Sequence, residues 1–246
     1  MPRPRNTIAS ALLIVSILIV TGLAVVLFLP PIGAPEYYYS IESALRSPRS
    51  AKKLARIDRG LTKLPEEIRP LTNLDTLVLT GNRISHLPDW LTRNPNIVRL
   101  SLSHNQLTAF SSGVTRMTVL QDLNLDYNCI ADLPASIGHL TQLKRLTLNH
   151  NRIKILPREI GQVDELITLS LGQNQLEQLP PEIGELIHLE WLYLVDNQLT
   201  DLPEEISKLE ALKNLQLDGN RLSSEAQEKV RRLLPHTQID FGEQRK

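Results

Sequence analysis

Apolar and polar residues alternate along this chain in a pattern that recurs every 23 residues. Apolar residues stand eight, five and three positions before an asparagine, as Leu143, Leu146 and Leu148 stand before Asn151. The asparagines that share this place are Asn82, Asn105, Asn128, Asn151, Asn174, Asn197 and Asn220. Seven registers without an insertion indicate a repeat protein, in which each unit buries its apolar side chains against its neighbours.

The alternation before each asparagine has the period of two that is typical of a short β-strand. Its leucines point into the core and the residues between them point outward, so stacked repeats form a parallel sheet. The asparagine side chain has two amide hydrogens and a carbonyl oxygen. We therefore expect it to be buried, where it satisfies the backbone groups of the turn in its own and the neighbouring repeat.

The motif Leu-Pro-x-x-Ile-Gly follows the strand and is complete at residues 133–138, 156–161 and 179–184. Proline fixes φ and donates no hydrogen bond, which favours a tight return segment over a long helix. The predicted fold is an α/β solenoid: an arc with a parallel concave sheet of about seven to eight strands and a lean convex side. The motif is interrupted at residues 94–95 and 110–111, where we expect an irregular convex side.

The repeat Leu-x-x-Leu-x-x-Leu-x-Leu-x-x-Asn-x-Leu-x-x-Leu-Pro-x-x-Ile-Gly covers roughly residues 54–222. It resembles the 23-residue leucine-rich repeats of Ras-suppressor-like scaffold proteins, plant intracellular Ras-group-related proteins and many bacterial repeat proteins. The resemblance implies a leucine-rich-repeat fold and a role in protein binding. It implies little else about function, because members of these families share few other properties.

An uncharged run of 22 residues, 8–29, precedes the repeats. As a helix it is about 33 Å long, enough to cross a hydrocarbon core of about 30 Å, and it is longer than the apolar region of a cleavable signal peptide. Arg3 and Arg5 precede it, and residues 30–45 contain no lysine or arginine. The sequence therefore predicts a single-pass membrane anchor with a cytoplasmic N-terminus and the repeats on the outer, periplasmic or extracellular side.

The complete domain prediction has five segments. Residues 1–7 are a short basic tail, 8–29 the transmembrane anchor, 30–50 a stalk and N-terminal cap, 51–222 the leucine-rich repeats, and 223–246 a C-terminal cap. Residues 40–46 are expected to form a short helix, and residues 238–241 a final edge strand. Ser224 and Gln227 fit the capping box of a helix that Pro235 stops. The three tyrosines at 37–39 form either an interfacial aromatic belt or part of the stalk.

Composition narrows the possible chemistry. The 27 basic and 27 acidic residues balance, so nothing favours nucleic acid, and the single cysteine excludes an intramolecular disulfide. We find no phosphate-binding glycine loop, zinc motif or nucleophile elbow, and we expect no cofactor, no metal and no catalysis. His104 and His150 lie two repeats apart with Tyr127 between them, too far to share one zinc ion. Ser103, His104 and Asp126 superficially offer a hydrolase triad, but an open arc has no pocket to exclude water.

The residues six and four places before each asparagine project from the concave face, and most are small and polar. Trp191 and Tyr193 place two large aromatics on one strand, and such side chains dominate binding energy at interfaces. They either bind a partner or pack on Asn214 and Gln216 of the next strand. Similarly, the alternating charges of Arg99, Asp122 and Arg145 either neutralise one another or recognise a charged partner. The predicted partner-binding residues are Trp191, Tyr193, Tyr127, Arg99, Arg145, Asp122, Asp126 and Asp196.

These observations predict a non-catalytic, membrane-anchored interaction module that binds a protein or peptide on its concave face. A cytoplasm-facing signalling scaffold of the same fold is the main alternative.

Overall fold

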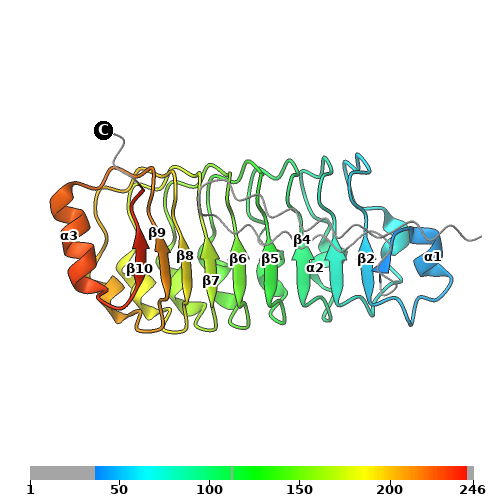
Figure 1. Ribbon diagram of the computed structural model, residues 1–246. Helices are drawn as coiled ribbons and strands as arrows, with labels where there is room; N and C mark the ends of the chain where they lie inside the picture. Colours follow the sequence, from blue (N-terminus) through cyan, green and yellow to red (C-terminus); the bar gives the residue numbers. More distant parts are fainter. Residues whose placement is uncertain (1–36, 112, 243–246) are drawn as a thin grey trace, which may run out of the picture.

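The computed structural model describes residues 37–111 and 113–242, which form ten parallel strands in one sheet. The strands follow one another in chain order along the solenoid (Figure 1). They are β1 Tyr37–Tyr38, β2 Lys53–Ala55, β3 Thr76–Val78, β4 Arg99–Ser101, β5 Asp122–Asn124, β6 Arg145–Thr147, β7 Thr168–Ser170, β8 Trp191–Tyr193, β9 Asn214–Gln216 and β10 Gln238–Asp240. The parallel sheet predicted from the sequence is confirmed, with more strands than the seven or eight expected.

The predicted transmembrane anchor at residues 8–29 lies outside the described residues. Within the described ranges, we find no helix whose length and apolar character would allow it to span a bilayer.

The register of the sheet reproduces the repeat length. Asp122 pairs with Arg99 on one side and with Arg145 on the other, each 23 positions away. The extra strands lie at the two ends. In particular, Tyr37 and Tyr38 form β1 and pair with β2, so the sheet begins earlier than the sequence predicted.

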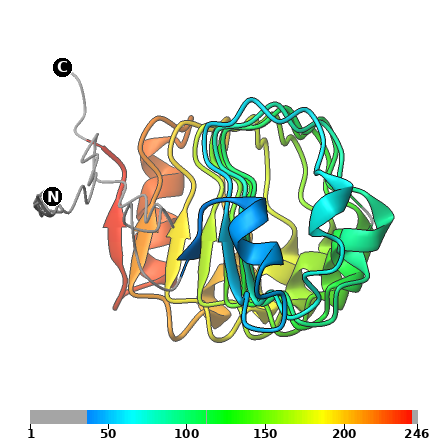
Figure 2. The ribbon, with the colours of Figure 1, turned by 90° about the vertical axis from the view of Figure 1, so that its right-hand side faces the viewer.

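The opposite side of each coil carries short helices. The 3₁₀ helices are η1 Glu66–Ile68, η2 Val114–Arg116, η3 Ala135–His139, η4 Arg158–Gln162, η5 Pro181–Glu185 and η6 Glu204–Lys208, and one turn of α-helix, α2 Asp89–Thr92, replaces them near the N-terminal end. This layer is lean, as predicted, and it changes form at α2 and η2, where the proline motif is interrupted. The view along the solenoid shows the helices on one side of the coil and the strands on the other (Figure 2).

The glycine that ends the Leu-Pro-x-x-Ile-Gly motif has a packing role that the sequence pattern did not explain. A Cβ atom on Gly184 would lie 2.3 Å from the backbone oxygen of Glu205, and one on Gly161 would lie 2.5 Å from that of Glu182. Only glycine lets the next 3₁₀ helix approach this closely.

Helices close both ends of the aliphatic core. The helix α1, Ile41–Leu45, begins after the N-cap Ser40 and covers the first coil (Figure 2). The helix α3, Ser224–Leu233, covers the last coil and buries Ala226 and Val230 (Figure 1). Its N-cap is Ser223, whose hydroxyl accepts a hydrogen bond from the N–H of Ala226, so the predicted capping box of Ser224 and Gln227 was wrong by one residue.

The asparagine of each repeat ties neighbouring coils together. Asn151 Nδ2 donates to the carbonyls of Leu148 at 3.0 Å and Asn149 at 3.2 Å in its own coil. It also donates to Leu125 of the preceding coil at 3.0 Å, while its Oδ1 accepts from the N–H of Ile130 at 3.0 Å. The same bonds recur at Asn82, Asn105, Asn128, Asn174, Asn197 and Asn220. This column holds the strands in the register that positions the concave face.

Candidate functional site: the concave face

The concave face consists of two rows of side chains that the strands direct away from the core. The outer row, six places before each asparagine, is Thr76, Arg99, Asp122, Arg145, Thr168, Trp191 and Asn214, and the inner row, four places before it, is Val78, Ser101, Asn124, Thr147, Ser170, Tyr193 and Gln216. Every member of the inner row is buried. In the outer row, Arg99 and Trp191 are exposed, and Arg145 and Thr168 are half-buried. A ligand on this face therefore meets mainly the outer row.

An Arg–Asp–Arg ladder crosses β4, β5 and β6 in the outer row. Arg99 Nε lies 2.9 Å from Asp122 Oδ2, and Arg145 Nη1 lies 2.6 Å from Asp122 Oδ1. The Asp122 side chain is only 12% exposed, whereas those of Arg99 and Arg145 are 50% and 36% exposed. Two guanidinium groups, both more exposed than the carboxylate between them, therefore share Asp122.

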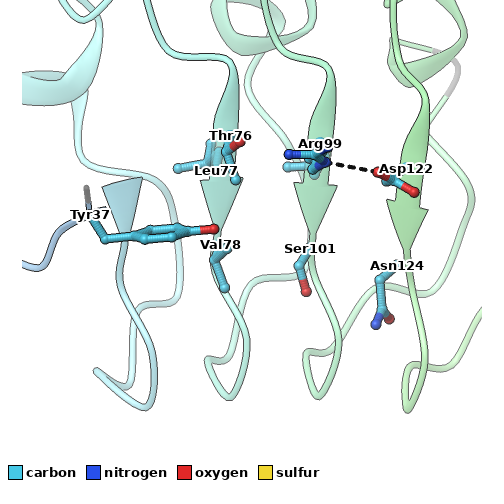
Figure 3. Close-up of a pocket in the computed structure, with 9 residues that line it drawn as sticks. Tyr37, Thr76, Leu77, Val78, Arg99, Ser101, Asp122 and Asn124 are labelled. Atoms are coloured by element: carbon cyan, nitrogen blue, oxygen red, sulfur yellow. Dashed lines mark hydrogen bonds and ion pairs between the residues drawn. The ribbon is translucent and has the colours of Figure 1, made fainter. Parts of the chain in front are cut away.

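A pocket opens beside this ladder at the N-terminal end of the face (Figure 3). Its lining combines the Tyr37 ring and Val78 with the polar groups of Arg99, Ser101 and Asn124. In Figure 3, Tyr37 reaches across from β1 toward Val78, and Arg99 stands on the opposite wall, where it bonds to Asp122. Sequence reasoning missed this pocket because it placed Tyr37 outside the sheet.

The two aromatic side chains of β8 have different surroundings. Trp191 is 37% exposed in the outer row, but Tyr193 is only 9% exposed in the inner row, and burial raises the pKa of its hydroxyl. The expectation of two exposed aromatics therefore holds for Trp191 alone. The backbone N–H of Trp191 donates to the backbone carbonyl of Ile167 at 3.1 Å, and Ile167 is 36% exposed. Trp191 thus exposes apolar surface on β8, and Ile167 exposes some directly before β7.

A row of stacked rings borders the face where β4, β5 and β6 end. The rings of His104 and Tyr127 stack with centroids 4.0 Å apart, and those of Tyr127 and His150 with centroids 3.8 Å apart. All three residues have φ of 53° to 54°, a left-handed conformation that is costly for residues other than glycine. Burial lowers the pKa of both histidines and raises that of Tyr127. The rings therefore form a neutral aromatic border at pH 7.

Asp126, one of the predicted partner-binding residues, is not accessible to a partner. It is 2% exposed, and its Oδ1 accepts hydrogen bonds from the backbone N–H of Asn149 at 2.7 Å and from Asn149 Nδ2 at 3.0 Å. Burial raises its pKa to about 7. Asn149 Oδ1 in turn accepts the N–H of Gly172 at 2.8 Å, so Asp126 belongs to a buried network that links three coils. Asp196, by contrast, is exposed and accepts a bond from Gln173 Nε2 at 3.2 Å.

The superficial hydrolase triad is not assembled. Ser103 is 1% exposed, and its hydroxyl lies 3.1 Å from that of Thr80. The Asp126 carboxylate is engaged by Asn149. Among the described residues, no hydrogen bond connects Ser103 or Asp126 to the His104 ring, which stacks on Tyr127 instead. This geometry offers neither an accessible nucleophile nor a base to activate it.

Two family models match the chain. One, described as a leucine-rich repeat region, matches residues 131–235, and the other, described as a leucine rich repeat, matches residues 95–153. The search of curated proteins gave no match.

Solved structures with the same fold come from bacteria and a plant. A leucine-rich-repeat protein of Leptospira interrogans is 37% identical with a TM-score of 0.64; the alignment covers 78% of this chain but 55% of that protein, so this chain spans about half its length. Internalin C2 of Listeria monocytogenes is 26% identical with a TM-score of 0.69, covering 79% and 80% of the two chains. The ectodomain of the Arabidopsis thaliana receptor kinase GASSHO1/SCHENGEN3, solved in complex with Casparian strip integrity factor 2, is 25% identical with a TM-score of 0.58, covering 77% of this chain and 26% of that one.

Proposed function

We propose that this chain, a leucine-rich-repeat protein related to those of bacteria, is a non-catalytic module that binds a protein or peptide on its concave face. The observation that carries this proposal is the outer row. It aligns two partly exposed arginines with an exposed tryptophan, whereas the inner row beside it is buried.

The chemistry of the face favours binding over catalysis. Arginine and tryptophan are the residue types that most often dominate binding energy at protein interfaces. Trp191 and Ile167 provide apolar area, and Arg99 and Arg145 provide charge that orients a partner. The candidate nucleophile Ser103 is buried and bonded within the sheet.

The plant receptor ectodomain supports a protein ligand by analogy, because its structure contains a bound factor. The analogy is limited to the fold and to the use of a leucine-rich-repeat domain for binding, because the alignment covers only 26% of that ectodomain. The residues that bind the partner are therefore proposed from this chain's own outer row.

Residues 8–29 are proposed to anchor the module in a membrane, with the N-terminus in the cytoplasm and the repeats outside. The uncharged run of 22 residues and the arginines before it support this topology. Deleting residues 8–29 should move the chain from the membrane fraction to the supernatant. In cells whose inner membrane is intact and whose outer membrane, where there is one, has been permeabilised, added protease should degrade the repeats of the full chain. Protection from protease would favour the cytoplasm-facing scaffold instead.

The binding face can be tested by site-specific photo-crosslinking of the full chain in its native membrane. A photoreactive benzoylphenylalanine replaces Thr168 on the outer row or, as the control, the exposed Glu204 on the convex side. The proposal expects a defined adduct from position 168 that is lost when Trp191→Ala is added. An adduct from position 204 alone would move the binding site to the convex side.

A further inference from the structure

We infer that the pocket beside Tyr37 is a subsite for one alanine residue of the protein ligand. The alanine methyl group enters the pocket, and its main-chain carbonyl oxygen accepts hydrogen bonds from Arg99 and Asn124. This inference rests on the proposed function and specifies which residue the N-terminal end of the concave face recognises.

The two walls of the pocket differ in chemistry. On one side, the ring of Tyr37 reaches from β1 toward Val78 on β3 and gives this wall a carbon surface (Figure 3). On the other side, Arg99 on β4 and Asn124 on β5 bring nitrogen atoms to the lining (Figure 3). A ligand group that fills the pocket must therefore be apolar toward Tyr37 and polar toward Arg99.

The polar wall offers hydrogen-bond donors. Asn124 is 3% exposed, and its Oδ1 accepts the backbone N–H of Asp126 at 3.0 Å, but its Nδ2 donates to no atom in the described part of the chain. Arg99 bonds to Asp122 through Nε, and among the same residues its Nη1 and Nη2 have no partner either. Because a buried donor without a partner is costly, this wall selects an acceptor oxygen.

The size of the pocket limits the apolar part of the ligand. Its volume is about 20 Å³, on a scale on which one water molecule needs about 10–15 Å³. The pocket therefore holds one methyl group, whereas an isopropyl group or an aromatic ring does not fit. A buried water needs about two to four polar partners, and most of the lining surface is carbon, which favours a methyl group over a water.

Alanine meets both requirements within one residue. Its methyl group and its carbonyl carbon are attached to the same Cα atom, so the methyl group can face Tyr37 and Val78 while the oxygen faces Arg99 and Asn124. Glycine lacks the methyl group, and valine exceeds the volume. Serine has the right size, but it would place a hydroxyl group against the carbon wall.

The test uses fluorine NMR on the full chain in mild detergent, with its five tyrosines labelled as 3-fluorotyrosine. The signal of Tyr37, assigned with Tyr37→Phe, reports on the pocket wall, and the signal of Tyr193 on β8 is the internal control. The probes are N-acetyl methylamides of alanine, glycine, serine and valine. Each carries one side chain between two amide groups and has no charge.

The inference expects the alanine probe to shift the Tyr37 signal saturably without moving that of Tyr193. It should bind at least about threefold more tightly than the other three probes, because burial of one methyl group contributes this much. Val78→Ala removes two methyl groups from the carbon wall, so the valine probe should then bind more tightly than the alanine probe. Circular dichroism checks that this variant is folded.

A second variant tests the polar wall. Asn124→Asp keeps an oxygen that accepts the N–H of Asp126 but replaces the donor Nδ2 with an acceptor. It should weaken the alanine probe at least about threefold, because the carbonyl oxygen then faces another acceptor. An unchanged affinity in a folded Asn124→Asp chain would overturn the role of this donor.

The remaining outcomes are distinguishable from failure of the proposed function. Equal binding of the alanine, glycine and serine probes would overturn the methyl subsite, as would an unchanged preference in Val78→Ala. No saturable shift with any probe would leave the pocket to water or to the chain itself and would also overturn the inference. In each case the photo-crosslinking experiment still decides independently whether the concave face binds a protein partner.

Discussion

Within the concave face, the strands β4–β6 and β7–β9 form the two halves of a six-strand stretch with the same 23-residue coil but different chemistry. The first half carries the Arg99–Asp122–Arg145 ladder, the buried Asp126 network and the stacked rings at its border. The second half has no charged residue in its strands and exposes Trp191. The asparagine column is common to both. The repeat therefore fixes the backbone, and the side chains that depart from it differentiate the two halves.

Substitutions in the asparagine column, which both halves share, should destabilise the protein equally in either half. Asn128→Leu and Asn174→Leu each leave one buried N–H, that of Leu107 or Ile153, without its partner. Each also removes one of the two asparagine hydrogen bonds that two buried carbonyls accept. Each substitution should lower the free energy of unfolding by roughly 3 kcal/mol. Urea denaturation followed by circular dichroism measures both. A loss confined to one half would show that the column does not carry the two halves alike.

The buried carboxyl of Asp126, in the first half, should make the stability of the protein depend on pH. The pKa of Asp126 is about 7 in the folded chain, above the ordinary value of 3.8, so folding takes up a proton between these pH values. Stability should therefore fall as pH rises through that window, and Asp126→Asn should stabilise the protein at pH 8 by roughly 2 kcal/mol, with less effect at pH 5. Of the corresponding residues of the second half, Gly172 and Val195 cannot titrate, and the third, Asp218, is only half-buried.

Unfolding of wild type and variant at pH 5 and pH 8 measures this difference. The two histidines with lowered pKa act in the opposite direction, and their contribution cancels when the two proteins are compared. The exposed Asp132→Asn is the control. If Asp126→Asn destabilised the protein at pH 8, the buried carboxylate would be a favourable charge and the account of the network would fail.

The smallest effect should come from the ladder. Because Arg99 is half exposed, Arg99→Gln should cost under about 1 kcal/mol of stability, and the cost should shrink in 1 M salt. Thermal unfolding at low and high salt measures it, with Arg116→Gln as the matched control. A larger loss of stability that does not change with salt would show that the ladder contributes substantially to the stability of the first half.

The sequence predicted the framework much better than the exposure of its side chains. The apolar period located the strands, the lean convex side and the final edge strand, because these follow from which residues point into the core. Alternation alone does not tell how far neighbours cover an outward side chain, so Tyr193 and Asp126 were expected to be more exposed than they are. It also missed Tyr37 in β1 and its pocket, because β1 is too short to show a period.

The most direct test of the account is the affinity of a partner, identified by crosslinking, for the full chain and three variants. Trp191→Ala should weaken binding at least thirtyfold, about 2 kcal/mol, because an exposed indole anchors the contact. Tyr193→Phe, which changes only a buried side chain, and the convex Glu204→Ala should leave affinity within about twofold of wild type. Equal binding by Trp191→Ala and wild type, or a selective loss in Glu204→Ala, would contradict binding on the concave face.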